Sequence, residues 1–287
     1  MSLRKFILPL GLFVVSWSAN AIQDDTLSEA QIREMIRISA DKDVENTKRQ
    51  RDYTYIRRDE RRNLDGRGRV KSAESKTYEV TILAGEQAER LIAKNDKPLS
   101  EKDAKKEDDK IRKLVAKGEK ESERSRRKRL EKSEKETEEE RQFVREVADA
   151  YKFQLRGTED IDGRPAWVID ADPLPGYKPR LKDAKILPKV RMRVWIDKAE
   201  QQWVKLDIEC IDTISWGLFL ARLHRGSTIH IEQTRVNDEV WLPRHAAMKL
   251  DARIALLKNL DLEFDVTFRD YQKFRTDAVI RPLGEVQ

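Results

Sequence analysis

The most regular feature of the sequence is an alternation of apolar and polar residues that begins at Tyr151 and continues to Phe274. A period of two is typical of strands with one buried and one wet face. In the clearest run, 260–268, Leu, Leu, Phe, Val and Phe alternate with polar residues. Turn signals such as Asp162-Gly163 separate the runs. The pattern predicts about eight strands, and because no helical pattern lies between them, the sheet should be antiparallel.

The residues before this half predict a helix and a hairpin. Residues 26–50 have an apolar stripe at helical spacing, and Ser28 followed by Gln31 matches a capping box. Residues 52–64 and 69–83 are rich in strand-forming residues, and the glycine-containing segment between them favours a tight turn. In the segment 86–94 the apolar residues are spaced as on a short helix.

Residues 100–141 have a different composition. They contain 16 Lys and Arg and 14 Asp and Glu, with no aromatic residue and no Pro. Ser100 followed by Asp103 is typical of a helix start, and mixed charges at short spacing support an exposed helix. We expect one or two charged helices that project from the domain or lie across it. The basic run 126–129 is a candidate contact for anionic lipid or an acidic partner, or simply a solvated helix face.

The first 21 residues have the layout of an export signal. Arg4 and Lys5 precede an apolar run of about a dozen residues, which is too short to span a bilayer as a helix. A small-residue site ends at Ala21, and acidic residues follow. This pattern predicts export and cleavage after Ala21, with an uncleaved anchor as the alternative. No Cys follows the run, which argues against lipid attachment there, so we expect a soluble periplasmic protein.

Charge and cysteine content narrow the possible functions. The formal net charge is +6, and removal of the signal with its two basic residues leaves +4. So small a surplus among so many charges, in an exported chain, argues against nucleic-acid binding. The single cysteine, Cys210, excludes an internal disulfide. It falls among the aliphatic positions of its strand, so we expect a core residue rather than a nucleophile.

No catalytic arrangement is evident, and we expect a protein that is not an enzyme and needs no cofactor. Neither a nucleophile elbow nor a glycine-rich phosphate loop is present. His230 and Glu232 lie two apart on a predicted strand and therefore share a face. Two ligands do not make a zinc site, and no spacing of Cys, His or Asp completes one, so we expect no metal.

Four short segments suggest a family. They are 162–169 (DGRPAWVI), 194–197 (VWID), 240–244 (VWLPR) and 268–274 (FRDYQKF), and they follow a signal peptide, a helix and a Tyr-rich hairpin. In this order they resemble the outer-membrane lipoprotein-sorting superfamily, the LolA-like proteins. The resemblance covers roughly residues 26–95 and 151–275, and the segment 100–141 is an insertion relative to compact members.

The resemblance implies an α+β fold, mainly antiparallel, in which a curled incomplete β-barrel is capped by helices. The expected divisions are a signal peptide at 1–21, a helix, hairpin and short helix at 22–99, a charged helical insertion at 100–141 and the completing sheet at 142–287. In the family's carriers an apolar concavity shelters acyl chains. If the helix and the side chains leave such a concavity open here, the candidate lining residues are the aliphatic strand positions Met192, Val194, Ile196, Val204, Leu206, Ile208, Ile229 and Ile231.

Two functions remain at this stage. The first is a periplasmic protein that binds the acyl chain of a lipid or lipoprotein for transport or sorting to the outer membrane. We expect it to be a monomer and to catalyse no reaction. The second is a periplasmic adaptor or envelope-stress regulator that binds a membrane-associated protein through the charged segment 100–141. A one-residue register slip would exchange the two faces of any strand, so the lining residues depend on strand pairing.

Overall fold

The computed structural model of the chain describes residues 27–83, 86–216, 221–254 and 258–274. The predicted signal peptide, 1–21, lies outside these ranges. None of the helices within them combines the length and apolar character needed to cross a lipid bilayer.

The described residues form an α+β fold with three α-helices, one 3-10 helix and thirteen strands. The helices are α1 (Glu29–Gln50), α2 (Glu101–Glu119), α3 (Glu123–Ala150) and η1 (Asp183–Lys189). The strands are β1 (Tyr53–Leu64), β2 (Val70–Leu83), β3 (Glu86–Lys94), β4 (Lys97–Pro98), β5 (Tyr151–Ile161), β6 (Arg164–Pro173), β7 (Val190–Asp197), β8 (Trp203–Cys210), β9 (Ile214–Trp216), β10 (Ala221–Leu223), β11 (Thr228–Val236), β12 (Val240–Ile254) and β13 (Lys258–Lys273).

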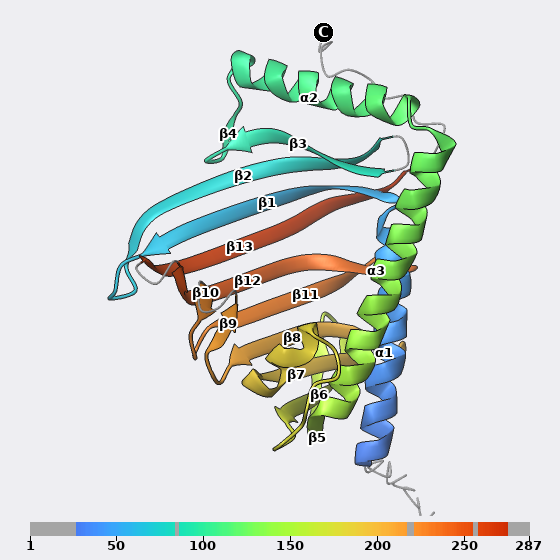
Figure 1. Cartoon of the computed structure of the whole chain (residues 1–287), viewed down its shortest axis with the longest axis vertical. Coiled ribbons are helices and arrows are strands. Elements are labelled where there is room, and N and C mark those ends of the chain that lie inside the picture. The colour runs from blue at the N-terminus through green and yellow to red at the C-terminus, as the bar shows by residue number, and fades with distance from the viewer. Residues whose placement is uncertain (1–26, 84–85, 217–220, 255–257, 275–287) are drawn as a thin grey trace, which may run out of the picture.

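All strands belong to one antiparallel sheet, whose order is β4-β3-β2-β1-β13-β12-β11-β8-β7-β6-β5, with β9 and β10 attached beside β12. The C-terminal strand β13 pairs with β1, which joins the N-terminal hairpin to the C-terminal half (Figure 1). Among the described strands no pairing connects β4 to β5, so the sheet is open. It is not strongly curled, and the expectation of a curled barrel was wrong in this respect. The antiparallel sheet itself is confirmed.

Helix α1 begins at the predicted capping box. The Ser28 hydroxyl accepts from the backbone N–H of Gln31, and the Gln31 side chain accepts from the backbone N–H of Ser28. The helix lies beside α3 across one end of the strands (Figure 1). Its apolar stripe, which includes Ile32, Met35 and Ile36, packs with Ala148 of α3 into the main core. We call the sheet face that carries α1 and α3 the inner face and the opposite one the outer face.

The segment 86–94 is strand β3 and not the predicted helix. It pairs with β2 along its length, because the outer edge of β2 offers backbone groups that a strand satisfies and a helix cannot. Helix α2 lies along β3 (Figure 1). Its Glu107 carboxylate accepts from the backbone N–H of Leu91, and Lys110 donates to the carbonyl of Glu89. The charged helix therefore covers an edge strand that could otherwise pair with another chain.

The charged segment is helical, as predicted, and divides into α2 and α3 at residues 120–122. Helix α3 continues through residue 141 to Ala150, and its C-terminal residues supply the buried contacts to the core. One of these is Glu146, whose carboxylate is buried and accepts hydrogen bonds from the backbone N–H groups of Arg180 and Leu181. These contacts hold the loop before η1 over the inner face.

Candidate functional site

The inner face carries two apolar rows that cross five neighbouring strands, β7, β8, β11, β12 and β13. In each row the residues lie directly opposite one another in the strand pairing, so they share a face. One row is Met192, Ile208, Ile229, Met248 and Phe264, and the other is Val194, Leu206, Ile231, Ala246 and Val266. We call these ten residues the apolar band. Four strand spacings of about 4.8 Å give it a length of about 19 Å.

The helices cover only one end of the apolar band. Val194 is buried, and Met192, Leu206 and Ile208 pack against the core formed with α1 and α3. On β11, β12 and β13 the side chains are only half-buried, as for Ile229 and Phe264. The inner face is therefore filled near β7 and partly open from β11 to β13.

A cavity of about 450 Å³ lies at the open end of the apolar band, between β13, β1 and β2. Its volume is in the range of pockets that hold small molecules. Phe264, Val266 and Phe268 of β13 supply its apolar side. The facing strands supply three basic and three acidic residues, namely Arg57, Arg61, Lys76, Asp59, Glu60 and Glu74.

Two of the arginines at this cavity lie over aromatic rings. The Arg57 guanidinium is 4.9 Å from the centre of the Tyr78 ring, and the Arg61 guanidinium is 6.0 Å from that of Phe264. Arg57 is also held by the carboxylates of Asp59 and Glu89, at 2.9 and 2.6 Å. Arg61 is exposed and donates to Asn63 at 3.2 Å. Because the charges are balanced, the cavity favours neither anions nor cations as a class.

Strand pairing decides the positions of the predicted lining residues. Met192, Val194, Ile196, Leu206, Ile208, Ile229 and Ile231 share the inner face, although Val194 and Ile196 are buried in the core. Val204 is an exception and lies on the outer face, where it is 2% exposed and packs with Trp195. A register shift between β7 and β8 at Trp195 and Ile196 moves it to that side. The apolar band also includes Ala246, Met248, Phe264 and Val266 of β12 and β13, which are not among the predicted lining residues.

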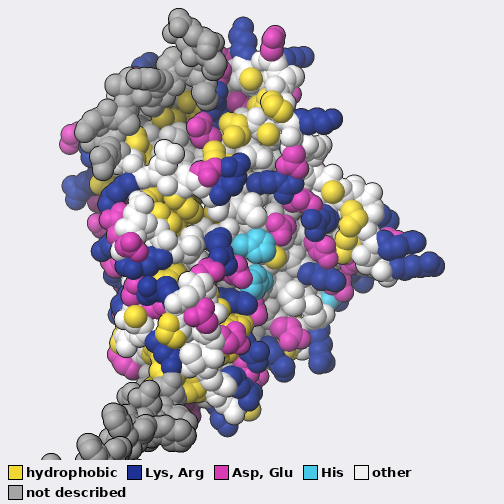
Figure 2. Space-filling model, turned by 180° about the vertical axis from the view of Figure 1, so that it is seen from behind, with side chains coloured by type: hydrophobic (Ala, Val, Ile, Leu, Met, Phe, Trp, Pro, Cys, Tyr) yellow, Lys and Arg dark blue, Asp and Glu magenta, His cyan; other side chains and the backbone are white. Residues whose placement is uncertain are grey.

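The outer face is densely charged, and histidines lie near its middle (Figure 2). Arg193 and Arg156 both donate to the Asp170 carboxylate, at 2.5 and 2.6 Å. The hydrogen bond from Arg193 is the main cause that lowers the pKa of Asp170, and the bond from Arg156 adds to it against the opposing effect of burial. The Asp170 carboxylate is thus shared by two arginines from the neighbouring strands β5 and β7.

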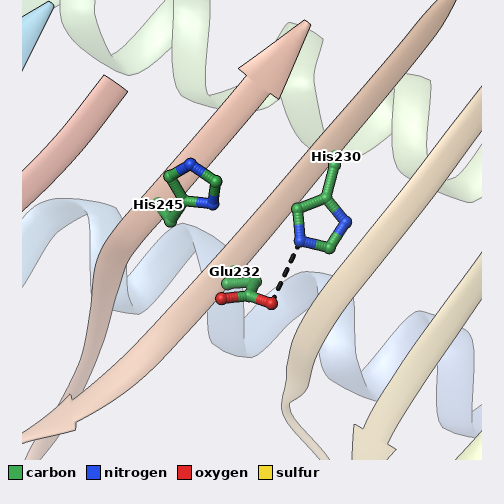
Figure 3. Close-up of side chains that lie close together, drawn as sticks. All are labelled: His230, Glu232 and His245. Carbon is green, nitrogen blue, oxygen red and sulfur yellow. Dashed lines mark hydrogen bonds and ion pairs between the residues drawn. The ribbon is translucent and has the colours of Figure 1, made fainter. Parts of the chain in front are cut away.

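Three side chains on this face come close enough to bind one metal ion: His230 and Glu232 of β11 and His245 of β12 (Figure 3). The His230 Nε2 and a Glu232 carboxylate oxygen are 3.0 Å apart. His245 joins them because it pairs directly opposite Glu232. The shared face of His230 and Glu232 was predicted, but the third residue depends on the register of β12. Burial alone raises the pKa of Glu232, but hydrogen bonds from Arg244 and His230 outweigh it, and the pKa is lowered.

Cys210 is buried in the main core, as predicted for a residue without a nucleophilic role. Burial raises the pKa of its thiol, which disfavours the reactive thiolate.

Comparisons with known proteins find similarity at the level of structure. No protein-family profile and no curated protein sequence matches the chain. An outer membrane lipoprotein-sorting protein domain from Vibrio parahaemolyticus is 11% identical, with 85% of this chain and 95% of that chain covered and a TM-score of 0.29. LolA superfamily protein NE2245 from Nitrosomonas europaea is 10% identical, with 85% and 93% covered and a TM-score of 0.31.

The structure of the Pseudomonas aeruginosa MucA/MucB complex also matches, at 9% identity, with 85% of this chain and 99% of that chain covered and a TM-score of 0.25. The matches thus include the LolA superfamily that the sequence resembles.

Proposed function

We propose that this protein binds the acyl chain of a lipid or lipoprotein along the apolar band, in the periplasm, for transport or sorting to the outer membrane. The observation that carries the proposal is the apolar band itself. Its two rows lie side by side on one face, and the helices leave them partly open from β11 to β13. An acyl chain is long, narrow and apolar, which matches a band about 19 Å long and two side chains wide.

The charges at the cavity suit the head of such a ligand. Arg61 and Lys76 lie there beside Asp59 and Glu74, so both signs of charge are available. A zwitterionic head group, or the peptide that carries an acyl chain in a lipoprotein, presents both signs as well. The cavity would hold this polar end, and the apolar band would extend from it toward β7.

The expected affinity follows from the apolar area of the acyl chain that binding removes from water. Each fully buried methylene contributes about 0.8 kcal/mol, so ten contribute about 8 kcal/mol, and about half of that if only one side is shielded. These values correspond to dissociation constants between about 1 μM and 1 mM. Binding would therefore be reversible, as a carrier requires.

The test combines lipid analysis with a matched pair of variants. Mass spectrometry of extracts from the purified protein should reveal acyl species, and a fluorescent fatty acid should bind to lipid-free protein. Ile229→Asp and Met248→Asp place a carboxylate in the apolar band and should each weaken probe binding at least tenfold. The control is Val70→Asp, which puts the same charge at a residue that is 56% exposed. The proposal fails if no acyl species co-purifies and no probe binds, or if the control weakens binding as much.

A specific observation supports the adaptor as a second candidate. Leu114 of α2 and Leu130 of α3 are 40% and 48% exposed on otherwise charged helices. Apolar side chains on a helix surface can dock in an apolar groove of a protein partner. The double variant Leu114→Asp and Leu130→Asp should keep the fold and the acyl binding. It should no longer capture the partner protein that the wild-type protein captures by crosslinking in periplasmic extracts. If crosslinked species are identical with and without the two changes, the adaptor hypothesis fails.

A further inference from the structure

We propose that His230, Glu232 and His245 form a binding site for a divalent transition-metal ion, with zinc as the reference ion, on the outer face of the sheet. The site is independent of the apolar band, because its three side chains project from the opposite face of β11 and β12. If no metal binds, the proposed acyl binding is unaffected, and if no acyl chain binds, the proposed metal site is unaffected.

The spacing of the donor atoms is the first argument. One donor atom from each residue lies within 4.8 Å of the others. Two atoms bound at about 2.1 Å to a tetrahedral zinc ion are about 3.4 Å apart. The His230 Nε2 and the Glu232 oxygen, at 3.0 Å, are already near that separation. His245 supplies the third donor, and Figure 3 shows the three side chains close together on two adjacent strands.

The second argument is that each histidine is oriented by its own carboxylate. Asp207 binds Nδ1 of His230, and Asp265 binds Nε2 of His245 at 2.9 Å. A carboxylate on the ring nitrogen away from the metal is the usual support of a metal-bound histidine, since it selects the tautomer and holds the ring. This assigns Nε2 of His230 and Nδ1 of His245 to the metal.

The third argument concerns the glutamate. Arg244 donates to one oxygen of the Glu232 carboxylate, at 2.8 Å, and Asp162 holds the same arginine from its other side. The second carboxylate oxygen is thereby aimed at His230. Lys205 lies directly opposite Glu232 on β8, but its ammonium group is 4.5 Å from the centre of the Trp195 ring.

The ligand set and its exposure indicate which ions would bind. Two imidazoles and one carboxylate suit zinc and other ions of that class, whereas magnesium and calcium prefer oxygen ligands alone. The side chains of His230, Glu232 and His245 are 29%, 23% and 29% exposed, so an ion can enter and water can complete its coordination. Because the ligands come from two strands, the bound ion would also tie β11 to β12.

The chain contains a matched control. His224 also pairs with a carboxylate, Asp251, at 2.9 Å, but it does not belong to the cluster. His224→Ala removes a histidine of the same kind and should leave metal affinity unchanged. His230→Ala and His245→Ala should abolish saturable binding. Asp265→Asn keeps both imidazoles and should weaken binding by about 10- to 100-fold, as expected for loss of a supporting carboxylate.

The measurement is a zinc titration of the untagged full-length mature protein in competition with a chromophoric chelator. Cobalt(II) serves as a spectroscopic probe, since coordination by imidazole produces a visible absorption band. Circular dichroism verifies that each variant is folded. We expect one ion per chain and a cobalt band that His245→Ala removes. The proposal is overturned if no single-equivalent binding occurs, or if His224→Ala weakens binding as much as His245→Ala.

Discussion

The buried carboxylate of Glu146 provides a sharp test of how α3 holds the loop before η1. Its two oxygens accept from two successive backbone N–H groups, Arg180 at 2.5 Å and Leu181 at 2.9 Å, and Tyr177 donates to it at 3.2 Å. The side chain is almost fully buried, so water cannot replace these bonds. The substitution Glu146→Gln preserves the shape but leaves one acceptor oxygen where there were two.

The magnitude follows from the bonds lost. A hydrogen bond to a charged group contributes about 1.5–3 kcal/mol, and a buried donor without a partner costs about 1–3 kcal/mol. The two costs overlap only in part, so their sum is an upper bound on the loss. We therefore expect Glu146→Gln to lower the free energy of unfolding by about 2–4 kcal/mol. Urea unfolding followed by tryptophan fluorescence measures this as a lower midpoint at unchanged slope.

Glu138→Gln is the matched control, because it makes the same change on the same helix at a side chain that is 51% exposed. It should change the free energy of unfolding by less than about 0.5 kcal/mol. If the two variants unfold at the same urea concentration, the buried carboxylate does not hold the loop before η1, and the reasoning is refuted.

Three further outcomes follow from the same structure. Ile32→Ala empties a fully buried position under α1 and should cost about 2–5 kcal/mol in a thermal or urea melt, and a loss below 1 kcal/mol would contradict the packing. Asp170 has a pKa lowered chiefly by Arg193, so its contribution is present above the unfolded pKa of about 3.9 and is lost as the pH falls through the folded value. The stability gap between wild type and Asp170→Asn should thus stay constant from pH 7 to 5 and shrink below about pH 4, and a gap that instead grew in acid would show the wrong sign. Glu107→Ala frees the backbone N–H of Leu91 at the edge strand β3 and should increase self-association in sedimentation velocity, and an unchanged distribution would mean that α2 does not protect this edge.

Much of the local structure was predictable because it depends on neighbours in sequence. The Ser28 capping box, the Asp162-Gly163 turn and the last strand, β13, all appear as predicted. Both turn residues have positive φ, 53° and 81°, which Asp and Gly tolerate. The segment 86–94 shows the limit of such reasoning, since its helical spacing was outweighed by the unpaired edge of β2.

The sites depended on register and strand order. The alternation of β8 predicted that Val204 and Leu206 share a face, but a bulge places them on opposite sides. The pairing of His245 with Glu232 likewise follows from an extra residue in β12, Arg244, which no local pattern reveals. Both are consequences of the period of two, in which one extra residue exchanges the faces.

The sequence by itself determined that this chain alternates into an antiparallel sheet, that α1 and α2 begin after Ser28 and Ser100, and that a long charged helical segment interrupts the sheet. It did so because propensity, capping and hydrophobic period act over a few residues. Only the tertiary structure decided that the sheet is open, that two apolar rows align across five strands, and that two histidines meet a glutamate on the other face. The physical reason is that strand order and register are settled by long-range pairing, in which each strand satisfies the backbone of a neighbour distant in sequence.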